Sequence, residues 1–283
     1  MSDVLSGQAL LPRTPPICLD AAQRSEFTDF LRELVAVASP HALAHFRESI
    51  PVTNKGAPSG DYDPVTQADR DAETSIRELI RARYPGHGIY GEEHGFEGGD
   101  SGLTWVIDPI DGTRAFITGQ LHWGVLVALF DGEKPTLGAM LQPFTKELFI
   151  ADGTHSWLER DGQRTSLAVR ACAELGDAIL CSTTPEMFAA AGELAAFEAL
   201  TACVRMRRFG GDCYSYCMLA HGLVDLIVEA DLKPYDIQAL IPVIEGAGGI
   251  VTDWQGNSAA HGGRVIAAGD RRVHAAALKM LKD

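Results

Sequence analysis

The chain has 283 residues, of which 46% are hydrophobic and 22% charged, and its formal net charge is −14. This length allows one large domain or two smaller ones with proper cores, and the composition is typical of a globular protein. The acidic balance argues against a nucleic-acid partner, which requires a basic face, and no apolar run is long enough to span a membrane. We expect a cytoplasmic protein, because residues 1–11 lack the basic and apolar regions of a signal peptide.

The six cysteines show neither a C-x-x-C pair nor the spacing of a zinc finger. In a chain of this size, scattered cysteines are typical of buried small side chains in a reducing compartment. Cys213 and Cys217 are spaced to share one helix face, but no partner residues complete a metal site there.

The first part of the chain is predicted to begin with helices. Residues 1–22 contain three prolines and predict a loose N-terminal arm. Apolar residues recur at three- and four-residue spacing in residues 20–50, and Pro40 divides this stretch into two helices. Residues 50–64 are rich in turn formers and predict a loop, after which a further helix extends to Ala82.

Short apolar and β-branched runs then predict a series of strands. These lie at residues 89–90, 103–107, 124–130, 137–142, 147–151 and 156–160. Asp-Gly pairs at 131–132 and 161–162 are turn signals between them. Because several strands follow one another with short turns, we expect an antiparallel sheet and assign residues 23–165 to an N-terminal α+β domain.

The remainder of the chain alternates between strands and helices. Strands are predicted at 178–182, 204–209, 224–229, 249–252 and 265–268, and helices at 185–200, 214–221, 237–246 and 273–281. Such alternation is typical of an α/β arrangement, so we assign residues 166–283 to a C-terminal α/β domain.

The stretch Trp-Val-Ile-Asp-Pro-Ile-Asp-Gly-Thr-Arg at 105–114 carries the strongest chemical signal. It brings Asp108 and Asp111 to the end of a buried strand, and Gly112 and Thr113 then open a helix that extends to Gly119. A helix N-terminus favours anions, and carboxylates favour hard cations such as Mg²⁺. Two converging acids would repel each other, and divalent metals remove that repulsion.

Glu92 and Asp236 are two further acids at the ends of predicted elements. Glu92 follows a strand, where a solvated turn residue is the plain alternative. Asp236 precedes a helix, where an N-cap is the plain alternative. Histidines are left out of the site, because hard cations prefer oxygen ligands.

Three motifs in this order resemble the inositol monophosphatase family of Mg²⁺-dependent phosphatases. They are Gly-Glu-Glu at 91–93, Asp-Pro-Ile-Asp-Gly-Thr at 108–113, and Asp236 before a helix that ends Glu-Gly-Ala-Gly-Gly at 245–249. The resemblance extends over nearly the whole chain from about Phe27. It implies the layered αβαβα sandwich of the inositol monophosphatase and fructose-1,6-bisphosphatase type.

Three other stretches are similar to one branch of that family, the histidinol-phosphate phosphatases. These are Arg-Ala-Phe-Ile-Thr-Gly at 114–119, Arg-Phe-Gly-Gly-Asp-Cys-Tyr at 208–214, and Glu-Ala-Asp-Leu-Lys-Pro-Tyr-Asp at 229–236. The resemblance implies hydrolysis of L-histidinol phosphate in histidine biosynthesis. An inositol monophosphatase or a broad sugar-phosphate phosphatase is the alternative, and a catalytically weak regulatory or binding protein is the alternative of another class.

The resemblance also implies roles for individual residues. Up to three Mg²⁺ ions would be bound by Glu92, Asp108, the carbonyl of Ile110, Asp111 and Asp236. The phosphate would lie against Asp111, Gly112 and Thr113. Asp69 would pair with the Thr113 hydroxyl and, with Glu92, orient and deprotonate the attacking water, so that Glu92, Asp69 and Thr113 are the catalytic residues.

On the substrate side, the expected residues are Arg208, Asp212 and Glu229 in the second half. Lys55 corresponds to the basic residue of a mobile loop, although its spacing to Asp69 is longer here because residues 56–63 read as an insertion. Glu93 is expected to be either solvent-facing or in support of its neighbour. The resemblance further implies a homodimer and inhibition by Li⁺.

Overall fold

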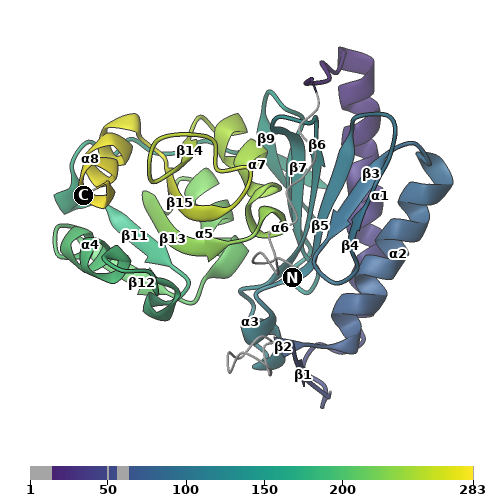
Figure 1. The fold of residues 1–283 in the computed structure, drawn as a ribbon, viewed down its shortest axis with the longest axis horizontal. Helices are drawn as coiled ribbons and strands as arrows, with labels where there is room; N and C mark the ends of the chain where they lie inside the picture. The colour runs from purple at the N-terminus through teal and green to yellow at the C-terminus, as the bar shows by residue number, and fades with distance from the viewer. Residues whose placement is uncertain (1–14, 50, 56–63, 283) are drawn as a thin grey trace, which may run out of the picture.

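The computed structural model describes residues 15–49, 51–55 and 64–282. Figure 1 shows two β-sheets that alternate with three layers of helices. One outer layer holds α1 (Ala21–Leu43) and α2 (Gln67–Arg83), the middle layer holds α5 (Asp212–Ala220), α6 (Pro234–Ile237) and α7 (Leu240–Gly246), and the other outer layer holds α4 (Glu193–Thr201) and α8 (Arg271–Leu281). This arrangement confirms the predicted αβαβα sandwich.

The larger sheet has eight strands in the order β10-β9-β8-β7-β6-β5-β3-β4. Its strands are β3 (Gly88–Gly91), β4 (Gly95–Glu97), β5 (Thr104–Asp111), β6 (Gly124–Phe130), β7 (Pro135–Gln142), β8 (Glu147–Ala151), β9 (Ser156–Arg160) and β10 (Gln163–Ser166). Neighbours pair antiparallel, as predicted, except β3 and β5, which pair parallel. The helix α2, which precedes β3 in the chain, packs against β5 and α1.

The smaller sheet has five strands in the order β12-β11-β13-β15-β14. They are β11 (Ile179–Ser182), β12 (Met206–Phe209), β13 (Leu226–Leu232), β14 (Ile250–Asp253) and β15 (Gly263–Ala268). Short elements complete the chain: the pair β1 (Thr53–Asn54) and β2 (Pro64–Val65), the helix α3 (Thr113–Ile117), and the 3₁₀ turns Leu175–Asp177 and Pro185–Met187.

The central strands β5 and β6 of the larger sheet bury both faces, which explains their continuous apolar runs. On β5, Trp105 and Ile107 pack with α1 and α2, whereas Val106 lies in the cluster between the sheets. That inter-sheet cluster joins β5 and β6 to Ile227 of β13 and Ile237 of α6. The two sheets therefore share a core at the site described below, and the division into two domains near residue 165 stays a prediction.

Three predicted helical stretches are joined or divided differently in the structure. Helix α1 continues through Pro40 to Leu43. Proline has no N–H to donate to the Ala36 carbonyl, but both residues are exposed, so water can bond this carbonyl instead. The predicted helix 185–200 is a 3₁₀ turn followed by α4, separated at Gly192, which adopts a left-handed conformation. The predicted helix 237–246 is divided into α6 and α7.

The predicted N-terminal arm falls partly outside the described residues, since residues 1–14 are not among them. In the described part, the Ile17 N–H donates to the Asp131 carbonyl at 3.2 Å, and Leu19 is buried against the larger sheet. Chain contacts therefore hold this segment before α1 begins.

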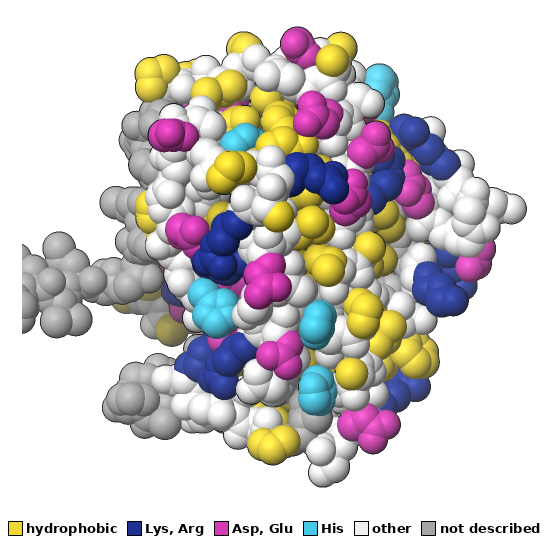
Figure 2. Space-filling model, turned by 90° about the vertical axis from the view of Figure 1, so that its right-hand side faces the viewer, with side chains coloured by type: hydrophobic (Ala, Val, Ile, Leu, Met, Phe, Trp, Pro, Cys, Tyr) yellow, Lys and Arg dark blue, Asp and Glu magenta, His cyan; other side chains and the backbone are white. Residues whose placement is uncertain are grey.

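The outer face formed by α1 and α2 carries charged side chains of both signs (Figure 2). Figure 2 shows basic and acidic side chains interspersed on it. Ion pairs account for part of this pattern, such as Arg83 with Glu33 at 2.7 Å and Arg81 with Glu97 at 2.6 Å. None of the helices in the described ranges is long and apolar enough to cross a membrane.

Candidate active site

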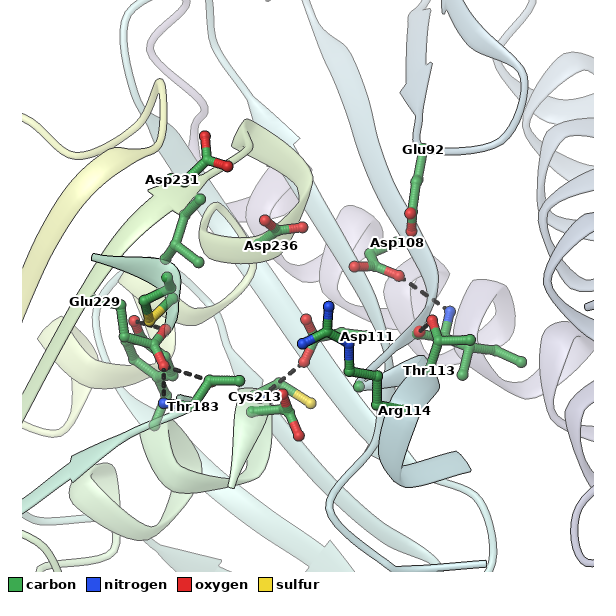
Figure 3. A pocket seen from close by; sticks show the side chains of 16 residues that line it. Glu92, Asp108, Asp111, Thr113, Arg114, Thr183, Cys213, Glu229, Asp231 and Asp236 are labelled. Carbon is green, nitrogen blue, oxygen red and sulfur yellow. Dashed lines mark hydrogen bonds between the residues drawn. The ribbon is translucent and has the colours of Figure 1, made fainter. Parts of the chain in front are cut away.

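A cavity of about 310 Å³ lies between the two sheets, where β5 and β13 end and α3, α5 and α6 begin. Its lining is rich in carboxylates (Figure 3). The acidic lining residues are Glu92, Asp108, Asp111, Asp212, Glu229, Asp231 and Asp236. Most of the residues expected from the sequence to bind metal or substrate therefore lie around one space.

A β-bulge brings Asp108 and Asp111 to the same side of β5. Side chains three residues apart in a regular strand point to opposite faces. Here Asp108 pairs with Leu126 and Asp111 pairs with Gly124, so the register shifts between them and β5 has one extra residue. Such an extra residue redirects the side chains that follow it. Both carboxylates can therefore reach the cavity.

Asp236 of α6 completes a group of three carboxylates. One oxygen each of Asp108, Asp111 and Asp236 lies within 4.8 Å of the others. Asp236 also accepts a hydrogen bond from the Lys233 N–H at 2.7 Å, as the third residue of a helix does in a capping box. The N-cap of α6 is Lys233, so the sequence alternative that Asp236 is itself an N-cap is wrong.

The acidic cluster is electrostatically strained without a cation. Burial, together with neighbouring carboxylates, raises the pKa of Asp108 and of Asp236 well above its usual range. Burial and the nearby Asp212 raise the pKa of Asp111 to about 8. All the donors are oxygen atoms, which suits a hard divalent cation such as Mg²⁺, and the charge of that cation would remove the repulsion. The donor set therefore fits the expected metal.

Glu92 lies at the end of β3 and points toward Asp108 (Figure 3). Its Oε1 lies 2.7 Å from the Nζ of Lys55, which is also 2.9 Å from Oε1 of Glu93. Burial raises the pKa of Glu92 to about 7, although Lys55 lowers it. The Glu93 side chain is only 3% exposed, so the solvent-facing alternative for this residue is wrong.

Lys55 therefore contacts the site, as expected from its resemblance to a loop lysine. Burial lowers its pKa, but the Glu92 carboxylate more than compensates and keeps the ammonium charged. The predicted insertion at residues 56–63 lies outside the described residues.

The predicted pair of Asp69 and Thr113 is not formed. The Asp69 carboxylate accepts hydrogen bonds from the N–H and Oγ1 of Thr66 at 2.9 and 2.6 Å, in a capping box at the start of α2. The Thr113 hydroxyl donates to the Ile110 carbonyl at 3.2 Å. Asp69 is nevertheless close enough to raise the pKa of Asp108 and of Glu92. Asp69 does not line the cavity.

Gly112 and Thr113 line the cavity next to Asp111. Gly112 has φ +83°, and a Cβ there would lie 2.5 Å from the carbonyl oxygen of His122. The backbone that precedes β6 therefore comes so close that this position requires glycine. This requirement is separate from the space that a bound phosphate is expected to need. Helix α3 has five residues and ends at Ile117, shorter than predicted.

Asp212 and Glu229 line the cavity from the C-terminal half of the chain. Glu229 accepts hydrogen bonds from the N–H and Oγ1 of Thr183 at 2.8 and 2.6 Å and from the Tyr216 hydroxyl at 2.8 Å. Burial raises its pKa to about 7, although these bonds lower it. Burial also raises the pKa of Asp212 to about 6, against the opposing effects of Thr183 and Arg114.

Several lining residues were not predicted from the sequence: Arg114, Thr183, Met187, Cys213, Tyr216, Asp231 and Leu232. Arg114 opens one of the branch motifs, and Cys213 and Asp231 lie inside the other two. Membership in these motifs was therefore a sequence signal that could have identified the three residues. Thr183 and Met187 follow β11 and have no local signature. They reach the cavity only because β11 pairs with β13.

Arg208 is the one expected substrate residue that lies elsewhere. It is exposed on β12 and lines a separate cavity of about 210 Å³ with His122 and Tyr214. Its strand is at the edge of the smaller sheet, away from the ends of β5 and β13. In this chain alone, the expected contact of Arg208 with the substrate is therefore not supported.

Comparison with known proteins agrees with this geometry. The inositol monophosphatase family model matches residues 23–283. The bifunctional phosphatase IMPL2, chloroplastic, of Arabidopsis thaliana is 40% identical over 254 residues, covering 84% of this chain and 70% of that protein. A histidinol-phosphatase of Mycobacterium tuberculosis is 36% identical over 209 residues, covering 73% of this chain and 80% of its own.

A solved structure of an inositol monophosphatase from Zymomonas mobilis aligns with a TM-score of 0.81 at 35% identity, covering 94% of this chain and all of that one. The family match includes both sheets and every residue that lines the acidic cavity. The chain belongs to the inositol monophosphatase family and is a phosphoric monoester hydrolase.

Proposed function

We propose that the chain is a Mg²⁺-dependent phosphatase that hydrolyses L-histidinol phosphate to L-histidinol and phosphate. The observation that carries this proposal is that two carboxylates outside the three-carboxylate cluster, Asp212 and Glu229, line the same cavity. We call this pair the acidic substrate end. A substrate with an anionic phosphate and a cationic ammonium and imidazole matches both groups of carboxylates, once cations neutralise the cluster.

The metal would be held by Asp108, Asp111, Asp236, Glu92 and the carbonyl of Ile110. When bound, Mg²⁺ neutralises phosphoryl oxygens and lowers the pKa of water. The bulge in β5 and the capping bond of Asp236 hold the three Asp carboxylates in place beforehand, which reduces reorganisation during the reaction.

The remaining groups would supply positioning and proton transfer. Glu92 is the proposed base for the attacking water, because its carboxylate points toward Asp108 (Figure 3) and lines the cavity beside the proposed metal ligands. The negative charge of Asp69 would raise the pKa of Glu92. Gly112 and Thr113 would contact the phosphoryl oxygens beside Asp111. As the P–O bond to the leaving group breaks, the leaving oxygen takes up a proton and the alcohol departs.

The acidic substrate end is the proposed determinant of substrate choice. Asp212 is the stronger candidate, because the oxygens of Glu229 already accept bonds from Thr183 and Tyr216. A charged hydrogen bond contributes about 1.5–3 kcal/mol, which corresponds to a factor of roughly 10 to 150 in kcat/KM. The relative named histidinol-phosphatase supports this substrate.

Inositol monophosphate is the second candidate substrate. The solved inositol monophosphatase structure at 35% identity favours it, and carboxylates also accept hydrogen bonds from sugar hydroxyls. A homodimer and inhibition by Li⁺ are further expectations from the family.

Phosphate release tests the proposal with L-histidinol phosphate and inositol 1-phosphate, each with Mg²⁺ and with EDTA. We expect Mg²⁺-dependent release with a preference for histidinol phosphate. A preference for inositol 1-phosphate would replace the proposed substrate, and no Mg²⁺-dependent release from either would contradict both candidates. Asp212→Asn should lower kcat/KM for histidinol phosphate at least about tenfold. The control is Asp161→Asn, because Asp161 is 73% exposed in the turn between β9 and β10 and does not line the cavity.

A further inference from the structure

The turn between β3 and β4, residues 92–94, rests on a buried ion pair of α2. The Nε of Arg77 lies 2.7 Å from Oε1 of Glu73, and their side chains are 4% and 0% exposed. Burying two charges is costly even when they are paired, and an apolar pair of similar size often gives equal or greater stability. The pair therefore calls for an explanation beyond the packing of α2.

The carboxylate of Glu73 is bonded to the backbone of the turn. Its Oε2 accepts a hydrogen bond from the Glu93 N–H at 2.7 Å, and its Oε1 accepts one from the His94 N–H at 3.2 Å. On the other side of the pair, Arg77 donates to the Gly95 carbonyl and to Glu97. One ion pair thus binds both the start and the end of the turn.

Gly91 adds an independent sign of this close approach. A Cβ at Gly91 would collide with the Glu73 carboxylate, so the chain needs glycine immediately before Glu92. The Glu92 N–H is separately fixed to the Ile107 carbonyl on β5 at 3.2 Å. The backbone is therefore held at Glu92 by the bond to β5 and directly after Glu92 by the two bonds to Glu73.

We propose that Glu73 is a positioning residue that directs Glu92 into the metal cluster by holding the turn after it. Glu73 does not line the cavity and acts only through the backbone of Glu93 and His94. An apolar side chain at this position would fill the space but would leave both N–H groups without their acceptor. This inference rests on the proposed role of Glu92 as a metal ligand.

Two variants and a control test the inference. Glu73→Gln keeps the volume but replaces one acceptor oxygen with an N–H₂ group, and Glu73→Asp keeps the charge beside Arg77 but withdraws it from the turn by one methylene. Glu78→Gln is the control, since Glu78 is exposed on the same helix. Each protein is measured for Mn²⁺ binding by calorimetry, for amide exchange at residues 92–94, and for thermal unfolding in EDTA.

We expect faster exchange of the Glu93 and His94 amides and Mn²⁺ binding weaker by about tenfold or more in both variants. Glu78→Gln should match the wild type in both measurements. If the folded variants bind Mn²⁺ as the wild type does, Glu73 is only structural and the inference is wrong. Glu73→Asp keeps this test available if Glu73→Gln does not fold. If the wild type itself binds no Mn²⁺, the proposed function fails first, which is a distinct result.

Discussion

The N–H of Cys213 donates a hydrogen bond to Oδ2 of Asp111 at 2.8 Å. This bond joins the end of β5 in the larger sheet to the first turn of α5, which packs against the smaller sheet. It orients Asp111 from the half of the chain that carries Asp212 and Asp236. The metal cluster and the substrate end of the cavity are therefore coupled through one carboxylate.

Asp111→Asn should abolish phosphate release and weaken metal binding without loss of fold. Its amide oxygen can still accept the bond from Cys213, and the neutral side chain removes a buried charge that is disfavoured at a pKa of about 8. The melting temperature in EDTA should therefore equal or exceed that of the wild type. Asp131→Asn is the matched control, because Asp131 is buried in a turn outside the cavity. Wild-type turnover in Asp111→Asn would remove Asp111 from the site.

Without metal, the protein should lose stability as the pH rises. Carboxyl groups titrate near pH 4 in an unfolded chain. In the folded chain the pKa of Glu92 and of Glu229 is about 7 and that of Asp111 about 8. Between about pH 4 and pH 8 the folded state therefore binds more protons than the unfolded state, and the free energy of unfolding falls with increasing pH.

Thermal unfolding in EDTA and in Mg²⁺ at pH 6 and pH 8.5 measures this effect. In EDTA the melting temperature should be lower at pH 8.5 by several degrees, where about 2–4 °C corresponds to 1 kcal/mol in a chain of this size. Mg²⁺ should raise it more at pH 8.5 than at pH 6, because metal binding requires the ionised carboxylates. The melting temperature of Asp111→Asn in EDTA should change less between pH 6 and pH 8.5 than that of the wild type. A stabilisation by Mg²⁺ that is larger at pH 6 would contradict the explanation.

The family resemblance predicted the order of the layers, and the residue pattern alone predicted two members of the acidic cluster. Asp108 and Asp111 stand out because two acids flank a proline at the end of an apolar strand, a local pattern that needs no knowledge of the fold. Glu92 and Asp236 required the family resemblance, since each is an ordinary turn or capping residue on its own. Asp236 is in fact the third residue of its helix, where it bonds the N–H of the N-cap Lys233, and it is also a member of the cluster.

The features that the sequence did not predict depend on the register between strands and on competition between hydrogen-bond partners. The bulge that aligns Asp108 with Asp111 exists only in the pairing of β5 with β6. Asp69 was expected to reach Thr113, but its Oδ2 accepts both hydrogen bonds of the capping box of α2, a competition that only the coordinates reveal. Arg208 is within five residues of Cys213 in sequence, yet its edge strand directs it to a different cavity.

Gly112→Ala should destabilise the protein more than a glycine substitution with the same backbone strain. Both Gly112 and Gly162 have positive φ, at +83° and +75°. A Cβ at Gly162 meets nothing within 4 Å, whereas one at Gly112 lies 2.5 Å from the His122 oxygen. Gly162→Ala should therefore cost about 1–2 kcal/mol from strain alone, and Gly112→Ala a further ~1–3 kcal/mol. Urea unfolding in EDTA measures both, and equal losses would show that the loop at His122 moves aside.

The six cysteines should separate into two reactivity classes. Cys18 and Cys203 are exposed, and the other four are buried: Cys172, Cys181, Cys213 and Cys217. Burial raises the pKa of each of these four, which lowers the thiolate fraction that reacts. A disulfide-exchange reagent such as Ellman's reagent should therefore modify two thiols rapidly in the native protein and all six after denaturation.

The position of Cys213 makes this measurement informative about the cavity. Its side chain lines the cavity but is only 2% exposed, and the adjacent Asp111 further raises the pKa of the thiol. A Cys18→Ser/Cys203→Ser variant should therefore lose the rapid phase and retain phosphatase activity in Mg²⁺. Rapid modification of Cys213, identified by mass spectrometry of the labelled peptide, would instead show that α5 opens away from β5 and that the bond to Asp111 is not maintained in solution.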